Sequence, residues 1–273
     1  GCGKTTAINC ILSLLKYDKG RIQVFGQEMT PTSYGIKKQI GIVPQEVAVF
    51  ENLTVWENID YFCGLYIDDS NLRKQYVQEA IEFVGLEDYK KFFPKKLSGG
   101  LKRRLNIACG ISHKPKLIFL DEPTVAVDAQ SRNFILEGIK RLNRQGSTII
   151  YTTHYLEEAE MLCDRIIIMD RGKSLVSGTV EQLKAMISTR EKIIVQFEHL
   201  EEDIGDKLRE ISHVIDVEKT HSEYTIKFEN GVNNISNLLE FINKEGLIYI
   251  KLYSQLPSLN DVFLELTGKE LRE

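Results

Sequence analysis

The alternation of apolar and polar residues divides the first 180 residues of the chain into short helices and strands. Apolar residues at helical spacing, such as Ile8, Ile11, Leu12 and Leu15, predict helices, whereas continuous apolar runs such as KLIFLD are typical of buried parallel strands. The pattern predicts strands over 21–26, 38–45, 116–121 and 147–154, helices over 5–20, 53–66, 72–86 and 129–146, and a hairpin over 164–178 that turns at Arg171 and Gly172. This order predicts an α/β sheet with a mostly helical insertion near residues 46–112.

From Glu191 onward the pattern changes to strand, helix, strand, strand, helix, strand. A β-α-β-β-α-β order is typical of a ferredoxin-like α+β domain. We therefore expect an α/β domain over residues 1–180 and a small ferredoxin-like domain over 190–273. A helix over 178–188 would join them, and an amphipathic helix over 258–268 would close the second domain.

The composition is ordinary for a globular protein and excludes several classes. The 273 residues are 42% hydrophobic and 27% charged, which argues against disordered and fibrous chains. A net charge of −4 leaves no basic excess, so we expect no nucleic-acid partner. The five cysteines are scattered without zinc spacing, and no apolar run is long enough to span a bilayer. A membrane role would therefore depend on a partner.

The chain opens with GCGKTT, which is the end of the phosphate-binding loop pattern G-x-x-x-x-G-K-[ST], and a helix follows. In a nucleotide site the amides from Gly1 to Thr6 would cradle phosphates, Lys4 would reach the β- and γ-phosphates, and Thr5 would bind Mg²⁺. The alternative is a plain capped turn. Because the first glycine of the pattern is missing, we expect the chain to be a fragment of a longer protein.

The run LIFLDEP places two carboxylates at the end of an apolar strand. In a nucleotide site Asp121 would hold Mg²⁺ through water, and Glu122 would orient and deprotonate the attacking water. The alternative is an ordinary strand that ends in a polar loop.

The run LSGG places Ser98 at the N-cap position of a further helix, followed by Gly99 and Gly100. Taken alone this is a surface helix cap. However, Gln45 ends the strand predicted over 38–45, and His154 ends the buried strand that comes after Glu122. Five such elements in this order seldom occur by chance, which argues against a plain helix cap.

The runs GCGKTT, IVPQE, LSGGLKRRLNIA, LIFLDEPT, VD and TTH closely resemble the ATP-binding subunits of ATP-binding-cassette (ABC) transporters, over about residues 1–180. LSGGLKRRL, DEPTVAVD and the tail SLNDVFLELTG are similar to the daunorubicin-resistance type of export ATPase, which is paired with ABC-2 type membrane subunits. The resemblance implies a P-loop NTPase fold of the ABC ATPase type with a helical subdomain, and ATP and Mg²⁺ as ligands.

The resemblance also assigns roles to residues. Glu122, His154 and Gln45 would be catalytic, with Gln45 sensing Mg²⁺ and water and His154 contacting the γ-phosphate. Mg²⁺ would be held by Thr5, Gln45 and Asp121. ATP would be bound between two subunits packed head to tail, and the nucleotide-binding residues would be Gly1, Cys2, Gly3, Lys4, Thr5, Thr6, Ser98, Gly99, Gly100 and Asp128.

The implied partners are a second ATPase subunit, identical or different, and an ABC-2 type permease that places the chain at the cytoplasmic face of the cell membrane. Two other functions remain to be separated from this one. A cassette ATPase of translation or DNA repair would carry two cassettes or an inserted coiled coil, and a non-hydrolysing regulator would lack Glu122 or His154. The sequence shows neither feature. One departure from the family pattern is Leu101, where the signature usually has glutamine.

Other features have plainer interpretations. The run LKRRL is expected to be a solvated basic helix face, and the histidines outside the motifs, His113, His199, His213 and His221, are expected on the surface. The aromatic residues Trp56, Tyr61, Phe62 and Tyr66 are either core residues or, as the resemblance implies, part of the contact with the membrane subunit.

Overall fold

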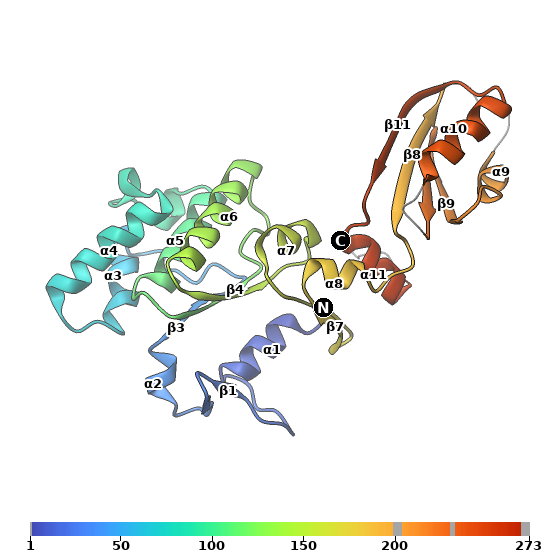
Figure 1. Ribbon diagram of the computed structural model, residues 1–273. Coiled ribbons are helices and arrows are strands. Elements are labelled where there is room, and N and C mark those ends of the chain that lie inside the picture. Colours follow the sequence, from blue (N-terminus) through green and yellow to red (C-terminus); the bar gives the residue numbers. More distant parts are fainter. Residues whose placement is uncertain (1, 199–203, 230–232, 269–273) are drawn as a thin grey trace. The chain divides into compact units, whose positions relative to one another are not determined.

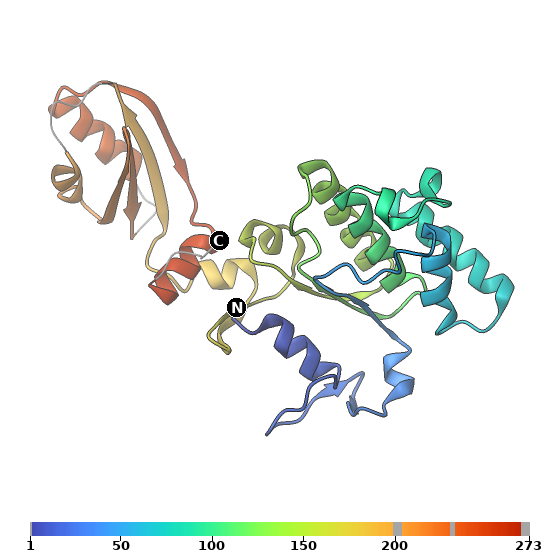
Figure 2. The same ribbon diagram turned by 180° about the vertical axis from the view of Figure 1, so that it is seen from behind.

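The computed structural model describes residues 2–198, 204–229 and 233–268. The chain divides into two compact units, Gly1–Cys163 and Asp164–Glu273 (Figures 1 and 2). The sequence pattern predicts residues 164–180 as part of the first domain, and this boundary stays a prediction. Among the described strands, the hairpin in this segment pairs with neither of the two larger sheets.

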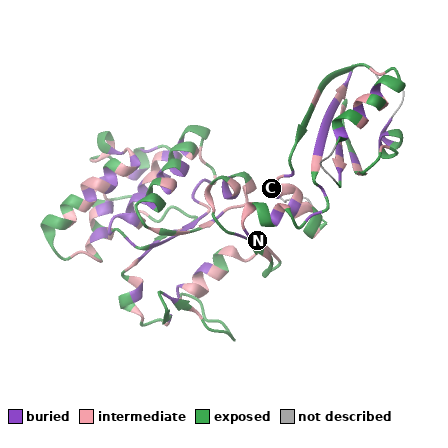
Figure 3. Cartoon of the chain, viewed as in Figure 1, coloured by how far each residue is buried: buried purple, intermediate pink, exposed green. Residues whose placement is uncertain are grey.

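The first unit is built on a three-stranded parallel sheet in the order β3-β4-β5. Its strands are β3 (Ile40–Val43), β4 (Leu117–Asp121) and β5 (Thr148–Thr152). The central strand β4 is buried over its whole length, as its continuous apolar run predicts (Figure 3). Because the strands are parallel, their carboxyl ends meet at one edge of the sheet.

Helices cover both faces of this sheet (Figures 1 and 2). One face is covered by helix α1 (Lys4–Ile11). Ile8 of this helix and Leu12, which follows it, pack in one cluster with Leu117 and Phe119 of β4. The short elements β1 (Gln23–Val24), β2 (Gln27–Glu28) and α2 (Tyr34–Lys37) add Val24 and Ile36 to this cluster. The α2 turn was not predicted from the sequence.

The opposite face of the sheet meets the helical segment, which forms α3 (Val55–Gly64), α4 (Ser70–Val84), two 3₁₀ turns (Glu87–Tyr89 and Pro94–Lys96) and α5 (Gly99–Ile111). Ile118 and Leu120 of β4 belong to the same cluster as Ile107 of α5. Side chains cap the N-termini of two of these helices. Thr54 and Glu57 form a reciprocal capping box at the start of α3, and Asp69 accepts hydrogen bonds from two backbone N–H groups at the start of α4. The predicted helical insertion is thus present.

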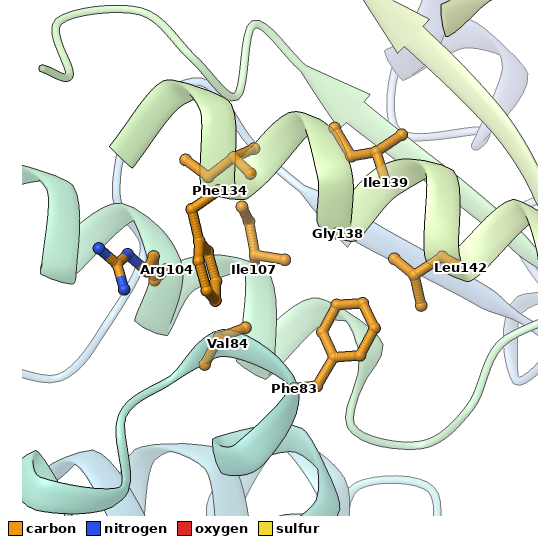
Figure 4. A pocket seen from close by; sticks show the side chains of 9 residues that line it. Phe83, Val84, Arg104, Ile107, Phe134, Gly138, Ile139 and Leu142 are labelled. Atoms are coloured by element: carbon orange, nitrogen blue, oxygen red, sulfur yellow. The ribbon is translucent and has the colours of Figure 1, made fainter. Parts of the chain in front are cut away.

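Helix α6 (Ala129–Arg144) packs against α4 and α5, and α7 (Leu156–Leu162) follows β5. Figure 4 shows side chains from α4, α5 and α6 that point toward one another. The guanidinium of Arg104 stacks on the Phe134 ring at 4.4 Å. Gly138 lies beside the ring of Phe83, and a Cβ at this position would meet that ring at 3.5 Å, an ordinary van der Waals contact.

The second unit begins with the predicted hairpin, β6 (Ile166–Asp170) and β7 (Lys173–Gly178). Arg171 and Gly172 form its two-residue turn with φ angles of 47° and 75°. Positive φ at both positions is the type I′ geometry that suits the twist of a two-residue hairpin. The predicted turn position is confirmed, and helix α8 (Val180–Lys184) follows behind a Thr179 capping box.

The rest of the second unit is an antiparallel sheet in the order β11-β8-β10-β9. The strands are β8 (Glu191–Phe197), β9 (Val214–Thr220), β10 (Glu223–Phe228) and β11 (Tyr249–Gln255), with helices α9 (Gly205–Arg209) and α10 (Asn234–Lys244) between them. Leu208, Leu238 and Ile242 from the helices pack on Ile193 and Val195 of the sheet. The predicted β-α-β-β-α-β order is confirmed.

Helix α11 (Leu259–Thr267) contacts α8 and is tied to the sheet by an ion pair. Lys192 Nζ lies 2.8 Å from Asp261 Oδ2, and the two side chains are only 11% and 10% exposed. Asp261 also accepts the N–H of Ser258, which caps this helix. No helix in the described ranges is long and apolar enough to cross a membrane.

Candidate active site

The carboxyl edge of the parallel sheet brings together four of the predicted site residues. Gln45 follows β3, Asp121 ends β4 with Glu122 directly after it, and His154 lies two residues beyond the end of β5. The parallel register pairs Asp121 with Thr152, so these ends are adjacent. Ligands of open α/β sheets bind at this edge.

Asp121 is fixed by two hydroxyl groups. Thr5 Oγ1 donates a hydrogen bond to Asp121 Oδ2 at 2.7 Å, and the Thr152 hydroxyl donates to the other carboxylate oxygen. The residue is only 5% exposed, and a buried carboxylate needs such partners. The end of β4 is therefore joined to the first turn of α1.

Glu122 lies between two side chains from different elements. Its Oε1 is 3.1 Å from Lys4 Nζ, and its Oε2 is 3.0 Å from His154 Nδ1. The backbone is in the left-handed region with φ 46°, and the Glu122 N–H donates to Thr152 Oγ1 at 3.1 Å. With the side chain 14% exposed, this is a carboxylate held in an uncommon backbone conformation beside a cation and an imidazole.

The loop before α1 provides the amides that the sequence predicts for phosphate binding. Gly3 adopts φ 96°, a conformation that favours glycine, and it is the N-cap of the helix. The N–H groups of Lys4, Thr5 and Thr6 are in the first turn, where no carbonyl precedes them in the helix. Cys2 lies beside Lys4, with its Sγ 3.8 Å from Nζ, and Gly1 is outside the described residues.

An open cavity of about 340 Å³ adjoins these groups. Thr5 and Asn9 line it from α1, Gln45 and Glu46 from the segment after β3, and Asp121 from β4. Its oxygen donors are hydroxyl, amide and carboxylate groups, which are the ligands that Mg²⁺ prefers.

A second group of predicted residues lies at the start of α5. Ser98 is the N-cap and accepts the N–H of Leu101 at 3.3 Å. A Cβ built on Gly99 would meet nothing within 4 Å, whereas one on Gly100 would lie 2.2 Å from Ser131 Oγ. Gly99 is therefore open to solvent, and Gly100 is required by packing against α6.

Asp128 lies beside this group as the N-cap of α6. It accepts the N–H of Ser131 at 2.8 Å, and this backbone hydrogen bond holds the pKa of the carboxyl below its usual range. Within the described chain, no hydrogen bond or ion pair joins Ser98, Gly99, Gly100 or Asp128 to the Lys4 and Glu122 group. The predicted residues thus form two separate groups.

Sequence reasoning was wrong about LKRRL and about one histidine. Arg103 is only 7% exposed and donates to the carbonyl oxygens of Gln45 and Pro44, at 2.6 and 3.4 Å. His113 is 8% exposed, stacks on Tyr66, and has its pKa lowered by burial. His213 and His221 are exposed, and His199 lies outside the described residues. Leu101, in place of the usual glutamine, packs against the core cluster of the first unit.

Sequence reasoning also missed Glu158, on α7. Its Oε2 accepts hydrogen bonds from the hydroxyls of Tyr151, Thr124 and Thr153, at 2.7, 3.0 and 3.0 Å. The side chain is buried and joins the loop after Glu122 to the segment that carries His154. The apolar residues near Glu158 on α7 are a weak sequence signal that it is buried, but they do not indicate its hydrogen-bond partners.

The fold and the site define a class. A lysine and a threonine at the start of a helix, behind a left-handed glycine and against an Asp-Glu pair at a strand end, are the parts of a P-loop ATPase. Ser98, Gly99 and Gly100, here called the Ser98 group, are the further residues that the resemblance to ABC ATPases implies.

Comparisons with known proteins agree with this class. The ABC transporter family matches residues 1–125, and the family "ATP-binding protein DrrA1-3-like, C-terminal domain" matches residues 178–267. The linearmycin resistance ATP-binding protein LnrL of Bacillus subtilis is 38% identical over 100% of this chain and 88% of its own length. The Nod factor export ATP-binding protein I of Rhizobium sp. is 33% identical over 100% of this chain and 87% of its own length.

A solved structure is similar as well. The dimeric structure of a post-hydrolysis state of the ATP-binding cassette MJ0796, bound to ADP and Pi, superposes with a TM-score of 0.59 at 26% identity. The superposition covers 65% of this chain and 81% of that one.

The chain therefore belongs to the ATP-binding subunits of ABC transporters, with a C-terminal domain of the DrrA1-3-like type. The predicted family, P-loop NTPase fold and ATPase function are confirmed. As a member of this family, the chain binds and hydrolyses ATP, forms dimers and works with a membrane permease partner.

Proposed function

We propose that this chain powers export through a separate ABC-2 type membrane subunit, at the cytoplasmic face of the cell membrane, with Glu122 as the general base of ATP hydrolysis. The observation that carries the catalytic assignment is the position of Glu122 between Lys4 and His154. The assignment to export is supported by relatives named for linearmycin resistance and for Nod factor export.

Each side chain has a distinct part in the proposed reaction. Lys4 and the first-turn amides of α1 bind the phosphates at the positive end of the helix. Glu122 takes a proton from the water that attacks the γ-phosphorus, and the bond to ADP breaks. His154 holds the Glu122 carboxylate through its Nδ1 and orients it. Transfer of charge to the phosphate oxygens is stabilised by Lys4.

The residues present fit a magnesium ion. The Thr5 hydroxyl and the Asp121 carboxylate are 2.7 Å apart and, with Gln45, line the same cavity. These hard oxygen donors suit Mg²⁺ and leave room for waters and phosphate oxygens in its coordination. When bound, the ion would neutralise charge on the β- and γ-phosphates.

The Ser98 group supports a shared site between two subunits packed head to tail. Ser98 and Gly99 are exposed, and Gly99 has open space where its side chain would be. Asp128 lies next to Gly100, since a Cβ on Gly100 would be 3.1 Å from Asp128 Oδ2, and Asp128 is exposed like Ser98 and Gly99. We therefore assign Ser98, Gly99, Gly100 and Asp128 to the nucleotide bound by the other subunit, and Lys4 and Glu122 to the chain's own nucleotide.

Substitution of Gly99 tests the shared site. Gly99→Asp adds a carboxylate beside phosphate oxygens, and like charges at about 4 Å repel by several kcal/mol at an effective dielectric near 20. ATP should still bind the monomer, while ATP-driven dimerisation seen by light scattering should be lost. Asn71→Asp, which adds the same group to the exposed first turn of α4, is the control. An unchanged ATP-dependent dimer for Gly99→Asp would refute the assignment.

A cluster of three aromatic residues on the helical segment, two exposed and Phe62 half-buried, is the proposed contact for the membrane subunit. The rings of Phe50, Tyr61 and Phe62 lie 4.9 to 5.8 Å apart, and Phe50 and Tyr61 are 45% and 48% exposed. Such a cluster is typical of a protein interface. Tyr61→Asp should abolish copurification with the membrane subunit, and Tyr34→Asp, at another exposed tyrosine, should not. Retained copurification of Tyr61→Asp would place the contact elsewhere.

A further inference from the structure

Two side chains on one face of α5 hold the segment that follows β3. Arg103 Nη1 donates to the carbonyl oxygen of Gln45 at 2.6 Å and to that of Pro44 at 3.4 Å. Asn106, three residues later on the helix, donates to the Pro44 carbonyl at 3.2 Å and accepts the Ala48 N–H at 3.0 Å. Both ends of the segment from Pro44 to Ala48 are therefore bound to the same helix.

The burial of these side chains makes the attachment strong. Arg103 is 7% exposed and Asn106 is 2% exposed. Within the described residues, Arg103 forms no ion pair with a carboxylate, so its buried charge depends on the two carbonyl groups. Hydrogen bonds from a charged donor are stronger than neutral ones, and removing a partner leaves a buried group unsatisfied.

The helix that makes these contacts also carries the Ser98 group. Helix α5 begins at Gly99 behind the Ser98 N-cap, and Arg103 follows about one turn later. Gly100 packs against Ser131, so the start of the helix is fixed as well. Gln45, on the segment that α5 holds, lines the cavity beside Thr5 and Asp121.

We propose that Arg103 and Asn106 are positioning residues that set the place of Gln45 at the magnesium site and join it to the Ser98 group through α5. The inference rests on the proposed function, which assigns Gln45 to the chain's own metal and Ser98 to the nucleotide of the other subunit. Helix α5 then links the two nucleotides of the dimer.

The test is a magnesium titration of the full chain at a saturating concentration of a non-hydrolysable ATP analogue. The readout is the thermal unfolding temperature at each Mg²⁺ concentration. Arg103→Gln and Asn106→Ala should each raise the half-saturating Mg²⁺ concentration by about 3- to 10-fold, which corresponds to one or two lost hydrogen bonds. Affinity for the analogue without Mg²⁺ should be unchanged. The control is Lys102→Gln, which removes a neighbouring cation that pairs with Glu51 and should have no effect.

A double-mutant cycle with Gln45→Ala distinguishes positioning from general stability. If Arg103 acts through Gln45, Arg103→Gln should change the Mg²⁺ midpoint by less than 2-fold in the Gln45→Ala background. Additive effects would overturn the inference. If Arg103→Gln does not fold, Arg103→Lys keeps the charge but not the planar fork, and the same cycle applies.

The outcomes also separate this inference from the proposed function. A midpoint shifted by Gln45→Ala but unchanged by Arg103→Gln and Asn106→Ala overturns the positioning role alone. A midpoint that Gln45→Ala leaves unchanged overturns the positioning role together with the placing of Gln45 at the metal, and it leaves the role of Glu122 to be tested by its own substitution.

Discussion

Two residues of the loop after β4 adopt left-handed backbone conformations, Glu122 with φ 46° and Ala126 with φ 58°. Such conformations cost about 1 to 2 kcal/mol for a residue with a Cβ. At Glu122 the conformation comes with contacts to Lys4 and His154, so the strain accompanies the arrangement that we propose as catalytic. The Ala126 side chain is exposed, so its burial does not offset the cost of the left-handed conformation.

Ala126→Gly should therefore stabilise the protein. Glycine adopts positive φ without the steric cost, though it loses more entropy on folding, so the expected net gain is about 0.5 to 1 kcal/mol. Urea unfolding of the full chain measures it. Ala129→Gly, the same change in the first turn of α6, should instead be neutral or destabilising. A loss of stability for Ala126→Gly would show that the loop does not carry this strain.

At the scale of elements, α5 depends on its second glycine and not on its first. A Cβ at Gly100 would lie 2.2 Å from Ser131 Oγ and 2.8 Å from its Cβ, whereas Gly99 faces open space. Gly100→Ala should therefore separate the start of α5 from α6 and cost about 1 to 3 kcal/mol. Gly99→Ala should stay within about 0.5 kcal/mol in the same unfolding experiment. Equal stability of the two variants would contradict this packing.

The attachment of α11 depends on pH. Burial disfavours the Asp261 carboxylate, but the hydrogen bonds from Lys192 and Ser258 outweigh it and lower the pKa. A lowered folded-state pKa means that the contribution to stability is complete above the unfolded value near 3.9 and is lost as the pH falls through the folded value.

Asp261→Asn should lower the unfolding temperature of the second unit at pH 7, because it leaves Lys192 buried without its counter-charge, at a cost of about 1 to 3 kcal/mol. The difference in unfolding temperature between Asp261→Asn and the unsubstituted protein should be constant from pH 7 to pH 5 and should become smaller below about pH 4. Asp206→Asn, at a carboxylate that is 99% exposed, is the control and should show no such difference. A difference that grows on acidification would contradict the lowered pKa.

At the scale of the whole molecule, the order of elements could be predicted because each leaves a local signal. The type I′ turn at Arg171 and Gly172, the capped helices and the β-α-β-β-α-β order all follow from residues close in sequence. The motif residues could also be placed, because parallel strands bring Gln45, Glu122 and His154 to one edge.

Contacts between distant segments could not be predicted. The burial of Arg103 depends on carbonyl groups of the segment after β3, and a basic residue on a helix gives no local sign of such acceptors. Glu158 is buried for the same kind of reason, through hydroxyls on β5 and on two loops. The predicted end of the first domain near residue 180 stays a prediction.

We assign Glu122 as the general base of ATP hydrolysis by this chain, and its replacement by glutamine tests that assignment. Glu122→Gln keeps the shape of the side chain but cannot accept the proton. The ATPase rate of the full protein with its partners should fall by about 10²- to 10⁴-fold, while ATP affinity should hardly change and the ATP-bound dimer should accumulate. Lys4→Ala, which removes the phosphate-binding cation, should instead abolish binding and hydrolysis together. Near-normal hydrolysis by Glu122→Gln would contradict the account and would make His154 the first candidate for the group that activates water.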